Sequence, residues 1–320
     1  MFDPKVEWHG YADAKPSESI QKHEIPGLAV ALAVPYQAGE DVLGVPVKQF
    51  KNYKRKKKAD RARRLSQWLA TEREQGLVLT GFVHAHTQVA AATLGLELIE
   101  ELPNTHVDRC GDAFRLFFGD EHIDFAQAVA LGYYFFTISF GILRAGTRIK
   151  PEQRQLFIAM DRFPGADTEG AKPGQRIPPS QGEKFIEFVQ RRSRTGIGIA
   201  ENNKSINLSY RLGTLDWWKK KGGTTWRKGK THPHFVLPDW LAASAIAREF
   251  GEEFVATFPN EKTGNEAVEA LRELHTVFKT FDFWSMDANV LQHIRADEGL
   301  WRVPADAREF VISRAESVQQ

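Results

Sequence analysis

The chain has 320 residues, of which 42% are hydrophobic and 11% aromatic, and its formal net charge is only +2. This composition is sufficient for a large folded core and excludes a wholly disordered chain. The one cysteine, Cys110, excludes an intramolecular disulfide and a cysteine-based zinc site, so we expect a reducing, cytoplasmic location. Residues 1–15 contain acids and no apolar stretch, so no signal peptide is expected.

The first half of the chain predicts strands and helices in alternation. Residues 27–35 form a short apolar run bounded by glycine and proline, which is typical of a buried strand. Further strands are expected at 42–50 and 77–86, and helices at 51–74, 87–102 and 122–145. The longest apolar stretch, residues 126–143, is shorter than the about 20 residues that cross a bilayer, so it predicts a buried core helix and no membrane span.

The second half begins with a compact apolar strand at 156–160, which Asp161 follows directly. Later elements are expected as a loop at 164–179, a helix at 181–192, a strand at 196–200, a loop at 216–231 and a helix at 238–250 with proline at its first position. The last 60 residues have helical patterns. We therefore expect a mixed α/β sheet flanked by helices over residues 1–250, and a helical C-terminal extension over residues 251–320.

Three aspartates are candidate metal ligands. Asp161 directly follows an apolar strand, Asp13 has a similar context near the N-terminus, and Asp239 opens a late helix. Carboxylates from distant parts of a chain can together hold Mg²⁺ or Mn²⁺, and two such ions about 4 Å apart support phosphodiester cleavage. The alternatives are structural, because aspartate also makes turns at strand ends and stabilises helix N-termini.

Short motifs around these acids resemble the family catalogued as domain of unknown function 3800. The matching segments are Tyr11-Ala12-Asp13-Ala14, Ala159-Met160-Asp161-Arg162, Glu201-Asn202-Asn203-Lys204-Ser205, and Phe235-Val236-Leu237-Pro238-Asp239 followed by Ala242-Ala243. The resemblance covers roughly residues 8–250. It implies a ribonuclease H-like fold, a metal site at Asp13, Asp161 and Asp239, and a role such as defence against mobile elements.

The chain departs from the family pattern at two of these motifs. Ala14 stands where the family has glutamate, for which Glu18 is a substitute, and Val236 and Pro238 replace the glutamine and alanine of the last motif. The lost acid leaves open how many metal ions are bound and whether the site is active or degenerate.

Two segments concentrate positive charge. Residues 48–64 hold ten Lys or Arg and a single acid, and residues 217–230 hold six with three tryptophans among them. Such clusters bind phosphate backbones, and aromatic side chains among them can stack on bases. The alternative is a solvated helix face and core tryptophans. The residues expected to bind nucleic acid, DNA or RNA, are Lys54, Arg55, Lys56, Lys57, Lys58, Arg61, Lys219, Lys220, Lys221, Trp226, Arg227 and Lys228.

Two His-x-His pairs, His84 with His86 and His232 with His234, add a further metal candidate. Residues i and i+2 of a strand share a face, so each pair can chelate an imidazole-binding metal, alone or with Asp161 or Asp239. His234 is expected to approach the acidic site as a ligand or proton shuttle. Paired histidines are also ordinary polar positions of strands.

Three functions follow from these residues. The first is a Mg²⁺- or Mn²⁺-dependent nuclease in which Asp13, Asp161 and Asp239 are catalytic and the basic segments hold the substrate. The second is a non-catalytic protein that binds nucleic acid or a partner and retains a degenerate site. The third is a histidine-based metal hydrolase of small molecules. The sequence lacks a phosphate-binding loop, a dinucleotide fingerprint and a nucleophile elbow, and the oligomeric state is left open.

Overall fold

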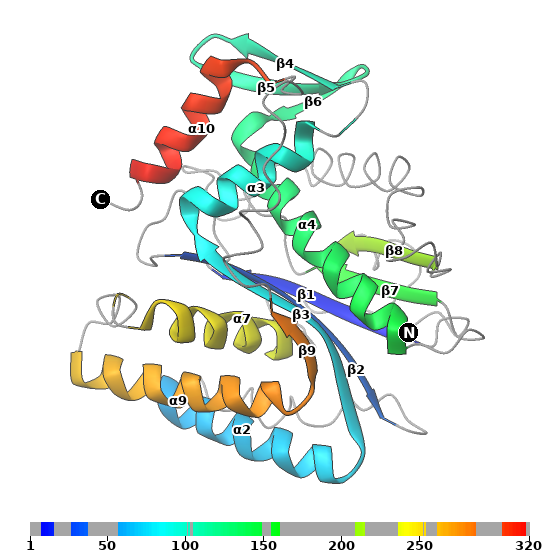
Figure 1. Ribbon diagram of the computed structural model, residues 1–320, viewed down its shortest axis with the longest axis vertical. Coiled ribbons are helices and arrows are strands. Elements are labelled where there is room, and N and C mark those ends of the chain that lie inside the picture. Colours follow the sequence, from blue (N-terminus) through cyan, green and yellow to red (C-terminus); the bar gives the residue numbers. More distant parts are fainter. Residues whose placement is uncertain are drawn as a thin grey trace, which may run out of the picture.

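The computed structural model describes residues 8–15, 27–37, 57–100, 102, 105–148, 155–160, 209–214, 236–251, 253, 261–285 and 303–317. Within these ranges the protein is a mixed α/β structure built on a sheet of six strands and a smaller sheet of three (Figure 1). The α/β class expected from the sequence is therefore confirmed.

The larger sheet has the order β8-β7-β1-β2-β3-β9. Strands β1, β2 and β3 form an antiparallel meander, β7 and β8 extend it in parallel at the β1 edge, and β9 pairs in parallel with β3. The strand bounds are β1 Trp8–Lys15, β2 Gly27–Gln37, β3 Leu77–Thr87, β7 Gln155–Met160, β8 Ser209–Thr214 and β9 Asp282–Ser285.

The alternation of side chains in β2 divides the core into two. Ala29, Ala31 and Ala33 face one side of the sheet, and the larger Val and Leu residues between them face the other. Both faces are buried, which explains why the strand reads as a continuous apolar run. The alanine face is flat, so a helix can approach it closely.

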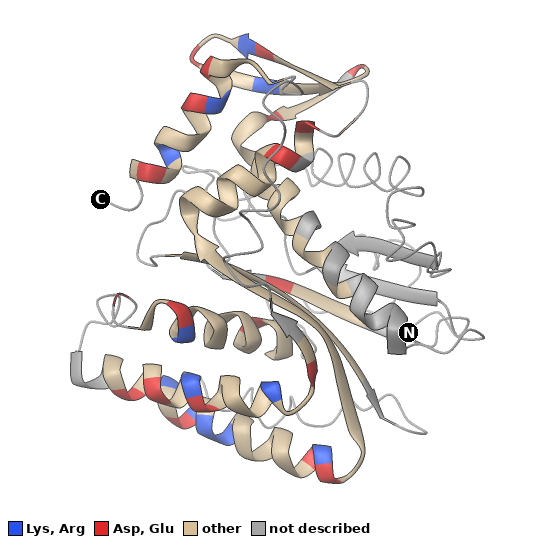
Figure 2. Cartoon of the chain, in the orientation of Figure 1, with Lys and Arg blue, Asp and Glu red and all other residues tan. Residues whose placement is uncertain are grey.

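Three helices cover the alanine face (Figure 1). They are α2 Lys58–Glu74, α7 Val236–Glu249 and α9 Glu261–Lys279. Helix α7 lies directly on β1, β2 and β3, and α9 packs on both α7 and α2. Helix α7 is rich in alanine and is buried almost throughout from Leu237 to Ala247. Figure 2 shows charged residues along the outer helices α2 and α9 and few on the strands β1, β2 and β3 of the larger sheet.

The opposite face carries α3 Gln88–Glu100 and α4 Phe125–Arg148. The smaller sheet packs beyond them with α10 Ala305–Ser317, whose Phe310 lies 5.4 Å from Phe114 between ring centroids. The smaller sheet consists of β4 Thr105–Cys110, β5 Ala113–Phe118 and β6 Glu121–Asp124. Helices α3 and α4 cross where Gly95 meets Gly132, because glycine allows their backbones to touch.

Several expectations differ from the structure. The apolar helix begins at Phe125 instead of residue 122, since residues 121–124 form β6. Helix α7 begins at Val236, so Pro238 is its third residue; proline is tolerated there because the N–H groups of the first turn have no intrahelical partner. The C-terminal region also contributes a strand, β9, to the edge of the larger sheet.

The strands and helices expected at 27–35, 77–86, 87–102 and 156–160 are confirmed, with small differences in their ends. The helix expected at 51–74 is confirmed from Lys58 to Glu74, and residues 51–56 lie outside the described residues. Among the described residues, no helix has the length and apolarity that a membrane crossing requires. The strands expected at 42–50 and 196–200, the helix at 181–192 and the loops at 164–179 and 216–231 lie outside the described residues.

Candidate functional site

Asp13 is a buried carboxylate on the face of the sheet that α7 covers. It follows Tyr11 by two residues and therefore shares its face, and its partner in β2 is Ala31. Tyr11 and Ala31 both belong to the core formed with α2, α7 and α9. Asp13 is only 8% exposed. A carboxylate at such a depth is stable only when it is neutral or paired with a cation or metal ion. It lies within β1, two residues before the strand ends.

The β1–β7 pairing leads to Asp161. The two strands are parallel, and their last described pair joins Ala12 to Met160. The next residue of β1 is Asp13, and the residue that follows Met160 in the sequence is Asp161. Asp161 itself lies outside the described residues.

Asp239 lies in the first turn of α7 and is half-buried. The ring of Phe250, at the other end of this helix, packs against Gly27 at the start of β2. Helix α7 lies on β1, β2 and β3, so Asp239 belongs to the helix that covers the sheet face of Asp13.

Two described carboxylates are too few for a metal centre. Among the residues that the structure describes, no three His, Cys, Asp or Glu side chains form a metal-binding group. The other expected ligands, Asp161 and His234, lie outside the described residues. Carboxylate oxygens on a dry sheet face are nevertheless the donors that Mg²⁺ and Mn²⁺ prefer, so the chemistry of Asp13 and Asp239 fits such an ion.

Arg61, in the described part of the first basic segment, contacts α7. Lys57 precedes α2 and is exposed, Lys58 is half-buried, and Arg61 reaches across to α7. The guanidinium carbon of Arg61 lies 5.6 Å from the ring centroid of Trp240, the residue next to Asp239. The basic segment is therefore in contact with the residue that follows Asp239 in α7.

The remaining expected nucleic-acid ligands cannot be placed. Lys54, Arg55 and Lys56 of the first segment lie outside the described residues. The same holds for the whole second segment, with Lys219, Lys220, Lys221, Trp226, Arg227 and Lys228. Their role stays a prediction.

The pair His84 and His86 does not belong to the acidic site. Both histidines lie in β3 on one face, as expected, but it is the face that α4 covers, where the His84 ring lies 5.5 Å from that of Tyr133. Asp13 and α7 are on the opposite face. The sequence-based idea that this pair combines with Asp239 in a hydrolase site is therefore wrong, because the sheet separates them.

Burial keeps both of these histidines neutral. They are 1% and 6% exposed, and their ring centroids are 4.0 Å apart. Burial, assisted by the neighbouring His86, lowers the pKa of His84 to about 2, and burial lowers the pKa of His86 to about 4. Both ring nitrogens of His84 and Nε2 of His86 are buried without a hydrogen-bond partner among the described residues.

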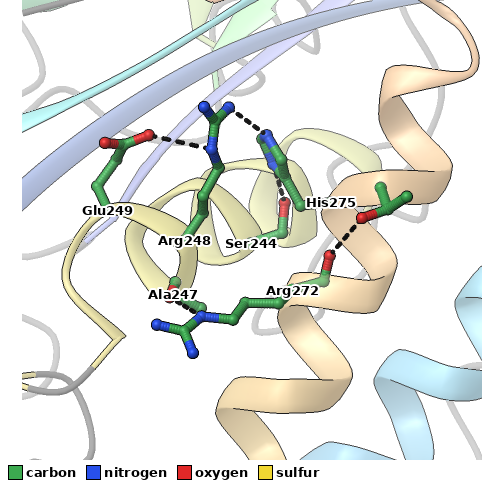
Figure 3. Close-up of polar contacts among 7 residues, drawn as sticks. Ser244, Ala247, Arg248, Glu249, Arg272 and His275 are labelled. Carbon is green, nitrogen blue, oxygen red and sulfur yellow. Dashed lines mark hydrogen bonds and ion pairs between the residues drawn. The ribbon is translucent and has the colours of Figure 1, made fainter.

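A serine–histidine contact between α7 and α9 resembles a catalytic pair but is structural (Figure 3). Ser244 Oγ lies 3.2 Å from His275 Nδ1 and donates a hydrogen bond to the Leu241 carbonyl oxygen at 2.8 Å. Arg248 lies 3.3 Å from His275 Nε2. Arginine can only donate, so Nε2 accepts and the imidazole proton is on Nδ1, where it donates to Ser244.

This tautomer gives Ser244 no general base. Burial first, and then the charges of Arg248 and Lys279, lower the pKa of His275 to about 4, so the imidazole is neutral at pH 7. Its unprotonated nitrogen faces Arg248 and not the serine hydroxyl. The cluster therefore joins α7 to α9, and a serine hydrolase is not supported here.

Comparison with protein-family models, with curated proteins and with solved structures finds no match for this chain. Function is therefore inferred from the positions of the described side chains. Sequence reasoning missed one residue of the site, Trp240, whose contact with Arg61 spans most of the chain. Its position beside Asp239 in an alanine-rich helix was the signal that could have indicated it.

Proposed function

We propose that the protein is a metal-dependent nuclease whose larger sheet is a ribonuclease H-like core. The antiparallel meander of β1, β2 and β3, extended in parallel at the β1 edge by β7 and β8, is consistent with the fold that the resemblance implies. The observation that carries the proposal is the β1–β7 register, whose last described pair joins Ala12, the residue before Asp13, to Met160, the residue before Asp161 in the sequence.

Asp13, Asp161 and Asp239 would hold Mg²⁺ or Mn²⁺ on the face covered by α7, with His234 beside them as a ligand or proton shuttle. When bound, the ions would activate a water molecule and stabilise the leaving oxygen of a phosphodiester. The alanine face of β2 and the small residues of α7 allow this helix to lie close to the sheet. The basic residues next to α7 would attract the phosphate backbone.

The test is cleavage by the full chain of labelled single-stranded and duplex DNA and RNA, with Mg²⁺, with Mn²⁺ or with EDTA. We expect metal-dependent cleavage that falls by at least about 100-fold in Asp161→Asn and in Asp239→Asn, because each substitution removes a charged ligand. Binding should persist in both variants. The matched control is Asp108→Asn, which removes an exposed acid of the smaller sheet and should cleave like the wild type.

The other outcomes of this assay distinguish between the possible functions. Binding without cleavage under every metal condition would replace the nuclease by a nucleic-acid-binding protein with a degenerate site, which the alanine at position 14 favours. The absence of both binding and cleavage would refute a function on nucleic acid. Cleavage that survives Asp161→Asn would refute the role of this carboxylate.

A further inference from the structure

The contact between Arg61 and Trp240 gives one residue of the basic segment a specific place. The guanidinium lies over the indole ring at 5.6 Å from its centroid, within the range of a cation–π interaction. Both side chains are half-buried, and Trp240 packs against the core of α2, α7 and α9. A flexible arginine is thereby held in one position at the α2–α7 boundary.

Arg61 differs in its partners from Arg63 of the same helix. Arg63, two residues further along α2, is paired with Glu266 of α9 at 3.0 Å. The Arg61 side chain has no hydrogen bond or ion pair with a described residue, and its Nε is buried. A half-buried guanidinium is costly unless its N–H donors find acceptors, so the arrangement is suited to bind an anion.

The position of this cation indicates which anion. Trp240 adjoins Asp239, and Lys57 lies exposed at the start of the same α2 turn. The planar guanidinium matches the two free oxygens of a phosphodiester. We propose that Arg61 binds a phosphodiester of a nucleic-acid strand beside Asp239, and that Trp240 positions its guanidinium.

This inference rests on the proposed nucleic-acid substrate, and a binding assay separates it from cleavage. Binding of short labelled single-stranded and duplex oligonucleotides is measured by fluorescence anisotropy in EDTA, from about 50 to 200 mM salt. We expect Arg61→Gln to weaken binding about tenfold and to reduce the salt slope by about one unit, because one charged contact is lost. Arg63→Gln removes the same charge from an ion pair and should change affinity less than about twofold.

Two further variants test the stacking. Arg61→Lys keeps the charge but loses the planar fork, so it should keep the salt slope and weaken binding by a smaller factor. Trp240→Leu should weaken binding several-fold at an unchanged salt slope, and should add nothing in the Arg61→Gln background. Melting temperatures of all variants show whether each is folded.

Wild-type affinity in Arg61→Gln would overturn the inference, and so would a wild-type chain that binds no oligonucleotide. If that variant binds normally while the wild type cleaves, the nuclease proposal stands and the role of Arg61 falls. If binding depends on Arg61 and no metal supports cleavage, the inference stands and the nuclease falls.

Discussion

Acidification from about pH 8 to about pH 5 is expected to destabilise the fold through three buried neutral histidines, His84, His86 and His275. Their pKa values in the folded chain are lowered to about 2, 4 and 4, from about 6.5 for an exposed histidine. Between these values only the unfolded chain binds the proton. Stability is therefore fully present above about pH 6.5 and is lost as the pH falls toward the folded pKa values.

The magnitude follows from the same values. At pH 5 each histidine lowers the free energy of unfolding by about 2 kcal/mol relative to pH 8, so the three together lower it by about 6 kcal/mol. A loss of this size is comparable with the whole stability of many domains, about 5–15 kcal/mol. Glu100 acts in the opposite direction, because burial raises its pKa to about 7 and its protonation favours the folded chain. Glu100 is partly exposed, so it should offset only a minor part of the loss.

Urea unfolding followed by tryptophan fluorescence at several pH values measures this effect. The variant is His84→Phe, since the site already holds aromatic neighbours in Phe82 and Tyr133. We expect it to lose about 2 kcal/mol less than the wild type between pH 8 and pH 5. His106→Gln is the control, because this histidine side chain is 61% exposed. Equal losses in His84→Phe and wild type would refute the reasoning.

Two packing predictions concern the helices. Gly95→Ala should lower stability by about 1–3 kcal/mol, since its Cβ would overlap the carbonyl oxygen of Val129 in α4; an unchanged melting temperature would mean that α3 and α4 are not in contact there. Ser244→Ala should cost about 1–3 kcal/mol by leaving the His275 Nδ1 proton without an acceptor. Ser313→Ala removes a similar hydrogen bond of an exposed serine and should be nearly neutral. Equal destabilisation by the two serine substitutions in thermal unfolding would contradict a stabilising role of the buried contact between Ser244 and His275.

Local pattern alone was enough for several elements. The short apolar run bounded by glycine and proline predicts β2, and the amphipathic pattern predicts α2. The smaller sheet was missed although its turns have a signal. Gly111 and Gly119 each precede an aspartate and adopt a positive φ of 65° and 71°, which is typical of hairpin turns. Strand β9 has only four residues, too few for a periodicity to appear.

The candidate site shows the same division. Sequence by itself determined which residues could do the chemistry, namely the acids at Asp13, Asp161 and Asp239 and the clustered cations, because these depend on residue type and local context. Tertiary structure alone decided that Asp13 faces α7, that His84 faces the other way, and that Arg61 meets Trp240. The period of a strand shows which residues share a face, but which helix covers that face depends on the packing of segments far apart in the chain.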